Sequence, residues 1–234
     1  MERLNKEDGV IMNFYKITNK EERHNGLQYK TGLNVDPLPW NPSGDCAPGG
    51  IYFSREDIFA FVNYGPWIRK VTIPEDAEMY ENPGSPKKWK ANKVILGKRR
   101  KIGVKVIKSL IGEGADIHID DELTLKWASE NGHFETAKLL LKHGANVNAN
   151  NEWALRCASI NGHLKIVKLL IKNGSDIHDW ALRFASENGH LEIVKILIEH
   201  GAYTHAKNNG ALMAARIYGH TKVAEFLLKH GATK

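Results

Sequence analysis

The stretch GHLKIVKLLIKNGSDIH, residues 162–178, returns with few changes as GHLEIVKILIEHGAYTH at residues 189–205. Each copy has a Gly-His pair before an apolar run and a Gly-Ser or Gly-Ala pair after it. Further Gly-His pairs begin at Gly132 and Gly219, so that successive pairs are 30, 27 and 30 residues apart. A fixed period of this length is typical of a solenoid, in which each repeat is one supersecondary unit. The period therefore predicts the fold of more than half of the chain.

One repeat contains two helices of different character. In residues 151–178, Leu155, Ala158 and Ser159 form one face of a short helix. Gly162 ends this helix, because glycine readily adopts the left-handed conformation found at helix ends. Residues 164–171 then predict a second helix with a broad apolar face, which only stacked neighbours can bury. We expect a half-repeat at residues 103–118, and then four full repeats that start near Asp121, Asn151, Asp179 and Asn208.

The second helix and its ending resemble the ankyrin repeat. The first helix departs from that family, because its usual Thr-Pro-Leu-His opening is replaced by WALR at residues 153–156 and again at residues 180–183. The loop before Trp153 is about three residues shorter than the usual ankyrin unit requires, and about three more are missing before Trp180. The resemblance therefore implies that the projecting β-hairpin fingers are reduced, and nearly absent before Trp180.

The histidines of the Gly-His pairs are candidate metal ligands on residue type alone. Zinc requires ligands that converge at close range, whereas these histidines are separated by whole repeats. The resemblance implies that they cap and pack the turn between the two helices. We therefore expect no metal site at these histidines. For the chain as a whole, no metal, no cofactor and no catalytic residue is predicted.

A partner-binding surface follows from the same resemblance, since the concave face of such a stack carries the two residues before each Gly-His pair. Aromatic and apolar groups on this face are plausible interaction anchors. The two tryptophans at the shortened loops either join this face or fill the space left by the lost fingers. The predicted partner-binding residues are Glu130, Asn131, Trp153, Ile160, Asn161, Trp180, Glu187, Asn188, Ile217 and Tyr218.

The residues before the repeats show no period. Strands are expected at residues 14–18, 50–54, 68–73 and 94–96, of which 68–73 alternates most clearly between polar and apolar residues. A helix is expected at residues 55–64, with Ser54 as its N-cap and Asp57 in the position of a capping box. The sequence thus predicts an α+β domain at residues 12–101, followed at residues 102–234 by an all-α, ankyrin-like solenoid with shortened fingers.

The formal net charge of +6 is concentrated in one segment. Residues 87–101, KKWKANKVILGKRRK, contain eight Lys or Arg and no acid. Such clusters bind phosphates or act as nuclear addresses, so Lys87–Lys101 makes nucleic acid an alternative, less favoured partner. Without a recognised reading module, a solvated strand edge and a linker are favoured. Trp89 is either a stacking platform or a strand residue shielded by lysine stems.

Three blocks resemble a domain that precedes ankyrin repeats in proteins of giant DNA viruses. They are HNGLQY at residues 24–29, DCAPGGIYF at 45–53 and KWKANK at 88–93. This resemblance implies a viral protein in the host cell cytoplasm, or in its nucleus, with host or viral proteins as partners. No apolar run approaches the roughly 20 residues that span a bilayer, so no membrane partner is expected. The two cysteines, Cys46 and Cys157, suggest no disulfide framework.

Two functions of different classes remain. The favoured one is a non-catalytic protein–protein interaction module, a viral adaptor that binds host proteins. The alternative is an N-terminal enzyme, targeted by the repeats, that resembles ADP-ribosyltransferases in the order of its elements. Its candidate residues are His24, Tyr52, Ser54 and either Glu78 or Glu81. A cavity that unites His24, Tyr52 and a carboxylate would favour the enzyme. A nucleophile–base pair of Cys46 and His24 would need hydrogen-bond proximity, which the sequence does not reveal.

Overall fold

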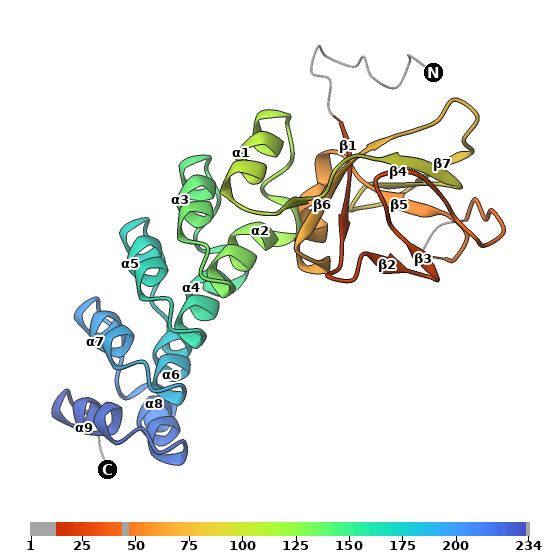
Figure 1. Cartoon of the computed structure of the whole chain (residues 1–234). Coiled ribbons are helices and arrows are strands. Elements are labelled where there is room, and N and C mark those ends of the chain that lie inside the picture. Colours follow the sequence, from red (N-terminus) through yellow and green to blue (C-terminus); the bar gives the residue numbers. More distant parts are fainter. Residues whose placement is uncertain (1–12, 44–46, 233–234) are drawn as a thin grey trace. The chain divides into compact units, whose positions relative to one another are not determined.

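A computed structural model describes residues 13–43 and 47–232, apart from the side chains of residues 206–208. A strand-rich region at residues 14–101 is followed by helices between residues 104 and 229, as the sequence predicts (Figure 1). By its contacts the chain divides into two compact units, Met1–Thr124 and Leu125–Lys234. The expected boundary at residues 101 and 102 remains a prediction. In the contact division, the half-repeat helix belongs to the strand-rich unit.

The strand-rich unit contains two main antiparallel sheets. The larger has the order β1 (Phe14–Thr18), β6 (Trp67–Thr72), β9 (Lys93–Leu96), β4 (Gly32–Val35), and β10 (Arg100–Lys101) also pairs with β6. The smaller has the order β5 (Ile51–Phe53), β8 (Lys88–Ala91), β7 (Met79–Asn82), and β2 (Arg23–His24) pairs with β3 (Leu27–Gln28) in a short hairpin. The four expected strands are confirmed as β1, β5, β6 and β9. The other strands were not predicted, because their sequences are short and carry no clear alternation.

The expected helix at residues 55–64 is present, but its predicted start is wrong. It is a 3-10 helix, η2 (Glu56–Tyr64), with Arg55 at its N-cap and no side-chain capping bond. The hydroxyl of Ser54 donates instead to the carbonyl of Lys87 at 2.7 Å, and Asp57 accepts from the amide of Lys87 at 2.6 Å. Both groups of the expected capping box therefore fasten the segment before β8.

The core of this unit lies around the smaller sheet. Its buried residues come from both sheets and, for Tyr29, from the segment after β3: Tyr29, Ile51, Phe53, Val71, Trp89, Ala91, Val94 and Leu96. The Trp89 ring meets Phe14 edge to face, with 5.2 Å between the ring centroids. Trp89 is only 5% exposed, so it is a core residue and the alternative of a stacking platform is wrong.

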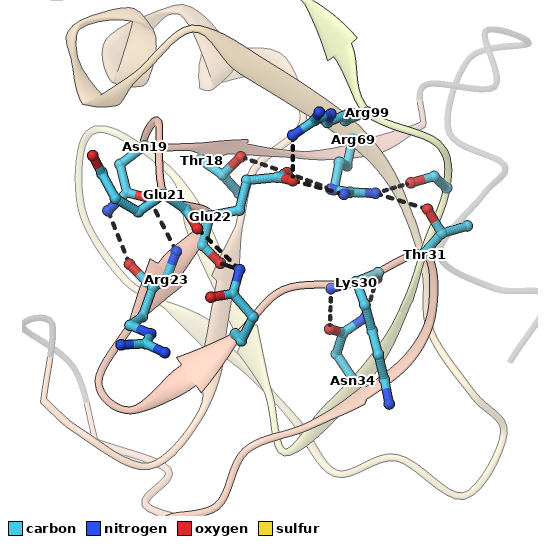
Figure 2. Close-up of polar contacts among 12 residues, drawn as sticks. Thr18, Asn19, Glu21, Glu22, Arg23, Lys30, Thr31, Asn34, Arg69 and Arg99 are labelled. Carbon is cyan, nitrogen blue, oxygen red and sulfur yellow. Dashed lines mark hydrogen bonds and ion pairs between the residues drawn. The ribbon is translucent and has the colours of Figure 1, made fainter.

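A buried ion pair joins β6 to the segment before β2. Arg69 donates from Nε and Nη2 to the two carboxylate oxygens of Glu22, at 2.7 and 3.0 Å (Figure 2). Its Nη1 donates to the Gly97 carbonyl at 2.7 Å and to the Thr31 hydroxyl at 3.1 Å, while Arg99 approaches Glu22 at 3.3 Å. The hydrogen bonds from Arg69 lower the pKa of Glu22 below its usual value. Two fully bonded charges can be buried in this way, whereas a single unpaired charge could not.

The remaining elements are helices that follow the predicted period. They are α1 (Val104–Gly112), α2 (Ile119–Glu130), α3 (Phe134–Lys142), α4 (Ala149–Ile160), α5 (Leu164–Lys172), α6 (Asp179–Glu187), α7 (Leu191–Glu199), α8 (Ala206–Ile217) and α9 (Thr221–Lys229). In the second unit the first helices α4, α6 and α8 stack in one row, and the second helices α3, α5, α7 and α9 stack in another (Figure 1). Val167, Leu170, Val194 and Leu197 are fully buried, as expected.

The loops between repeats confirm the reduced fingers. Residues 174–178 carry no strand, and α6 begins directly at Asp179, so no hairpin forms between Ile177 and Trp180. Where the loop is longer, the first helix starts with a left-handed turn in which Asn150, Asn151 and Glu152 have φ values of 50, 55 and 54°. Such non-glycine residues cost about 1–2 kcal/mol each. The buried carboxylate of Glu152 lies 2.6 Å from Nδ1 of His178, a contact that holds the turn.

Candidate functional site

The Gly-His pairs connect successive repeats through one recurrent hydrogen bond. The histidine Nε2 donates to a backbone carbonyl near the end of the preceding repeat's first helix. The distances are 3.0 Å for His163–Glu130, 3.0 Å for His190–Ile160 and 2.9 Å for His220–Glu187. The packing role implied by the resemblance is therefore confirmed for these three. Across the residues that the structure describes, no cluster of His, Cys, Asp or Glu is placed to hold a metal ion.

Each of these rings lies against the glycine of the preceding Gly-His pair. Gly132, Gly162 and Gly189 have φ values of +71, +73 and +71°. A Cβ atom on any of them would lie 2.8 Å or less from the histidine ring of the next repeat. Glycine is therefore required both by its own backbone and by its neighbour's ring. The Gly-His signature thus specifies contact between repeats.

The predicted partner-binding residues divide by exposure. Glu130, Asn131, Asn161, Asn188, Ile217 and Tyr218 are exposed, whereas Trp153, Ile160, Trp180 and Glu187 are half-buried. The three asparagines have a local role, because each side-chain amide donates at 2.9 Å to the carbonyl four residues earlier in its own helix. Their part in partner binding stays a prediction. In the last repeat, Tyr218 takes the place of these asparagines before the Gly-His pair, and it is 58% exposed.

The two tryptophans lie beneath basic side chains, an arrangement that sequence reasoning missed. The Lys126 ammonium is 3.7 Å from the ring centroid of Trp153, and the Arg156 guanidinium is 5.8 Å from that of Trp180. Each cation comes from the repeat before its tryptophan. The sequence contains a pattern that could have indicated this arrangement. Counting back from the glycine of the Gly-His pair, a basic residue lies six positions earlier in three repeats, and a tryptophan lies nine positions earlier in two. The cation–π contacts favour a packing role for both tryptophans.

Four large apolar side chains on α8, at its C-terminal end and in the loop before it are exposed. They are Tyr203, Met213, Ile217 and Tyr218, which are 73, 53, 73 and 58% exposed, and we refer to these four residues as the apolar patch. The last two were predicted, and Tyr203 and Met213 were missed. Their signal lies in the aligned repeats, where Met213 replaces the basic residues Lys126, Arg156 and Arg183, and Tyr203 replaces Asp116, Asn146 and Asp176. Several exposed large apolar side chains on one helix and its entry loop indicate a contact surface.

The sequence profile of ankyrin repeats (three copies) matches residues 100–181 and 178–234. The chain belongs to the ankyrin repeat family. The departures noted in its first helices and its shortened loops are therefore variations within that family.

Similar proteins come from Acanthamoeba polyphaga mimivirus. One ankyrin repeat protein is 36% identical over 140 residues, which cover 53% of this chain and 46% of the relative. A second is 33% identical over 132 residues, covering 54% of this chain and 65% of the relative. A third protein, described as uncharacterized, is 36% identical over 127 residues, covering 52% of this chain and 92% of the relative. The matched part of the chain thus spans about half to two thirds of the first two relatives.

The basic segment before the ankyrin repeats is largely engaged within its own unit. Lys90 is fully buried, with its ammonium 5.3 Å from the Tyr52 ring centroid, and Lys93 forms an ion pair with Asp76. Arg99 contacts Glu22 and lies 4.6 Å from the Trp67 ring centroid. These contacts favour the structural interpretation of Lys87–Lys101 over a nucleic-acid site. Among the described residues, no helix is long and apolar enough to cross a membrane.

A cavity of about 120 Å³ lies in the strand-rich unit, and it brings together three residues of the enzyme alternative. His24, Tyr52 and Ser54 all line it, whereas Glu78 and Glu81 do not. The Tyr52 hydroxyl donates to the Ala47 carbonyl at 3.2 Å, and the Ser54 hydroxyl is bonded to Lys87. Among the described residues, the lining includes no carboxylate. The criterion set for the enzyme is therefore met only in part.

Burial lowers the pKa values of two titratable groups in this cavity. Burial lowers the pKa of Lys16 to about 7, and burial together with the Lys16 charge lowers that of His24. The Nδ1 atom of His24 lies 3.2 Å from the Tyr64 hydroxyl. The suggested partner of His24, Cys46, lies outside the described residues, so that pair is not placed.

Proposed function

We propose that this chain is a non-catalytic protein-recognition module that acts as a viral adaptor for a host protein. The observation that carries this proposal is the apolar patch on the last ankyrin repeat. Exposed clusters of aromatic and aliphatic side chains lower the solubility of a monomer, and they commonly mark interaction sites. Large aromatic side chains also dominate the binding energy of protein interfaces.

The construction of the repeats supports the same function. The inter-repeat histidine bonds use backbone carbonyls of Glu130, Ile160 and Glu187, so these bonds do not depend on the side chains at the three positions. Their mixed chemistry, acidic at two positions and apolar at one, suits recognition of a specific partner. A solenoid offers an extended surface for such contacts, in contrast to the enclosed site of an enzyme.

The proposed viral setting rests on the similarity to mimivirus proteins. Several similar proteins are encoded by a mimivirus, so we place this protein in the cytoplasm of an infected cell, with the nucleus as the alternative. Nucleic acid is a less favoured partner, because many charges of the basic segment contact other residues of their own unit. An ADP-ribosyltransferase-like activity is also less favoured, since the cavity that unites its candidate residues lacks the carboxylate.

The test compares partner capture by a variant of the apolar patch with capture by a control variant altered on another exposed surface. The full chain with Ile217→Ser and Tyr218→Ala is used for affinity purification from Acanthamoeba lysate, followed by quantitative mass spectrometry. We expect loss of the proteins captured by the wild type, since each anchor contributes about 2 kcal/mol, or roughly 30-fold in affinity. The control variant, Lys168→Ala with Lys172→Ala, changes exposed residues of a second helix and should retain capture.

A further variant distinguishes the competing surface. Reversal of Lys98, Arg99 and Arg100 to glutamate should leave capture largely intact. If this reversal abolishes capture while the patch variant binds normally, the basic segment is the site and the proposal is wrong.

A further inference from the structure

The cavity of the strand-rich unit has the size of one aromatic ring. Its volume is about 120 Å³, and an engineered protein cavity of about 150 Å³ admits benzene. Pockets that enclose drug-sized ligands are several times larger, at about 300–1,000 Å³. The cavity can therefore enclose a single ring or a similarly small group, but not a whole nucleotide.

The walls of the cavity suit a planar ring. Tyr52, Phe61 and Tyr64 contribute aromatic side chains, and the His24 ring meets that of Tyr64 edge to face, with 6.2 Å between their centroids. Ile58 adds an aliphatic surface. Aromatic pairs favour such edge-to-face and offset arrangements, so a ring that enters here finds partners on several sides.

Two lysines, Lys16 and Lys88, line the cavity beside its aromatic and hydroxyl groups. Lys16 is 6% exposed, and its Nζ donates to the Tyr52 carbonyl at 2.8 Å, while the Lys88 ammonium lies 5.6 Å from the Tyr52 ring centroid. A protonated ammonium has three donors, of which the Tyr52 carbonyl accepts one, and the same ammonium lies 4.6 Å from the Tyr29 ring centroid. Asp36 is the acidic group whose charge acts on Lys16, and its two oxygens accept from the amides of Leu38 and Gly50.

We infer that this cavity is a binding site for a small aromatic carboxylate. The ring lies among Tyr52, Phe61 and Tyr64, and the carboxylate accepts hydrogen bonds from the buried Lys16. Lys88 adds a second positive charge to the same site. This ligand site is independent of the proposed partner-binding surface and of any catalytic activity.

The inference has a consequence for pH. Because burial lowers the pKa of Lys16 to about 7, part of the protein carries an uncharged Lys16 near neutral pH. A bound carboxylate favours the protonated ammonium, so binding takes up a proton, and affinity falls as pH rises above 7. His24, Tyr29, Lys88 and Asp36 face or act on this group, and among them the negative charge of Asp36 already favours protonation.

The experiment measures binding of benzoate to the full chain by calorimetry and by saturation-transfer NMR, with acetate, benzamide and NAD as comparison probes. We expect benzoate to bind roughly tenfold or more tightly than either acetate or benzamide, because only benzoate provides both the ring and the charge. Lys16→Met should weaken benzoate by a similar factor and leave benzamide unchanged. Calorimetry in buffers of different ionisation enthalpy should show proton uptake near pH 7.

Two further variants keep the test informative if Lys16→Met does not fold. Lys88→Met should also weaken benzoate selectively, and Tyr64→Ala should weaken benzoate and benzamide together. Lys108→Met changes an exposed lysine of α1 and should have no effect. The inference fails if benzoate does not bind at millimolar concentration, if acetate or benzamide binds equally well, or if Lys88→Met and Tyr64→Ala both bind benzoate like the wild type. It also fails if NAD binds and benzoate does not displace it.

Discussion

The strand-rich unit and the ankyrin repeats satisfy their buried polar groups in different ways. In the strand-rich unit, a charged pair, Glu22 and Arg69, joins residues 47 positions apart, and Arg99 reaches the same carboxylate from 77 positions away. In the repeats, hydrogen bonds from a histidine ring to a backbone carbonyl recur at separations of 33, 30 and 33 residues. The first arrangement is unique and depends on the whole unit, whereas the second is local and repeated. The two units should therefore respond differently to damage.

The largest expected effect comes from breaking the charged pair. Arg69→Met leaves the Glu22 carboxylate buried without its main partner, which should cost about 3–5 kcal/mol in the free energy of unfolding. Hydrogen exchange should show lost protection throughout the strands. Arg23→Met, at an exposed site nearby, is the control and should change stability by less than about 0.5 kcal/mol. A cost below about 1 kcal/mol for Arg69→Met would show that this unit is not organised around the pair.

Removing a core side chain from a repeat should cost a similar amount or less but act locally. Leu170 is fully buried in α5, and Leu170→Ala should cost about 2–5 kcal/mol. Because repeats couple mainly to their neighbours, hydrogen exchange should accelerate in α5 and toward the C-terminal repeats, while the strands keep their protection. Leu169→Ala, a half-buried neighbour, should cost less. Uniform loss of protection in both units would remove the contrast between them.

A smaller effect is expected for one inter-repeat bond. His190→Ala leaves the Ile160 carbonyl without its side-chain donor, which should cost about 1–3 kcal/mol. His200→Ala is a matched control, since the ring of His200 bonds at 2.9 Å to Ile196 within its own helix. If both variants lose the same stability in thermal denaturation, a histidine bond between repeats contributes no more stability than a histidine bond within one helix.

The last prediction concerns how the contribution of Glu22 to stability changes with pH. The pKa of Glu22 is lowered in the folded chain, so its charge stabilises the fold fully above the ordinary carboxyl pKa of 4.5. This stabilisation is lost as pH falls through the lowered pKa. The difference in unfolding free energy between wild type and Glu22→Gln should therefore stay constant from pH 7 to about 5 and shrink below that. A difference that is independent of pH would mean that Glu22 is not ionised in the fold.

The same contrast explains what could be predicted from the sequence. The helices, the buried Leu170 and the shortened loops could be predicted because the same sequence pattern recurs in several repeats. The Glu22–Arg69 pair has no periodic signal, and neither residue type is expected inside a core. The expected capping box failed because a distant residue, Lys87, bonds to both of its groups.

The candidate binding surface was predictable in part for a related reason. Position within a repeat indicated Ile217 and Tyr218 correctly as exposed residues. Tyr203 and Met213 were missed because they lie outside the two positions that the family resemblance singled out. A comparison of side-chain chemistry at every aligned position would have found them, since both are apolar where the other repeats are polar.

The inter-repeat histidine bond has an implication for divergence among such proteins. Its acceptor is a main-chain oxygen, which every amino acid possesses, so the bond itself does not depend on the side chain attached to the same residue. Glutamate and isoleucine already alternate there at Glu130, Ile160 and Glu187 without altering the bond by more than 0.1 Å. Substitutions at these positions can therefore accumulate without loss of the acceptor of this bond.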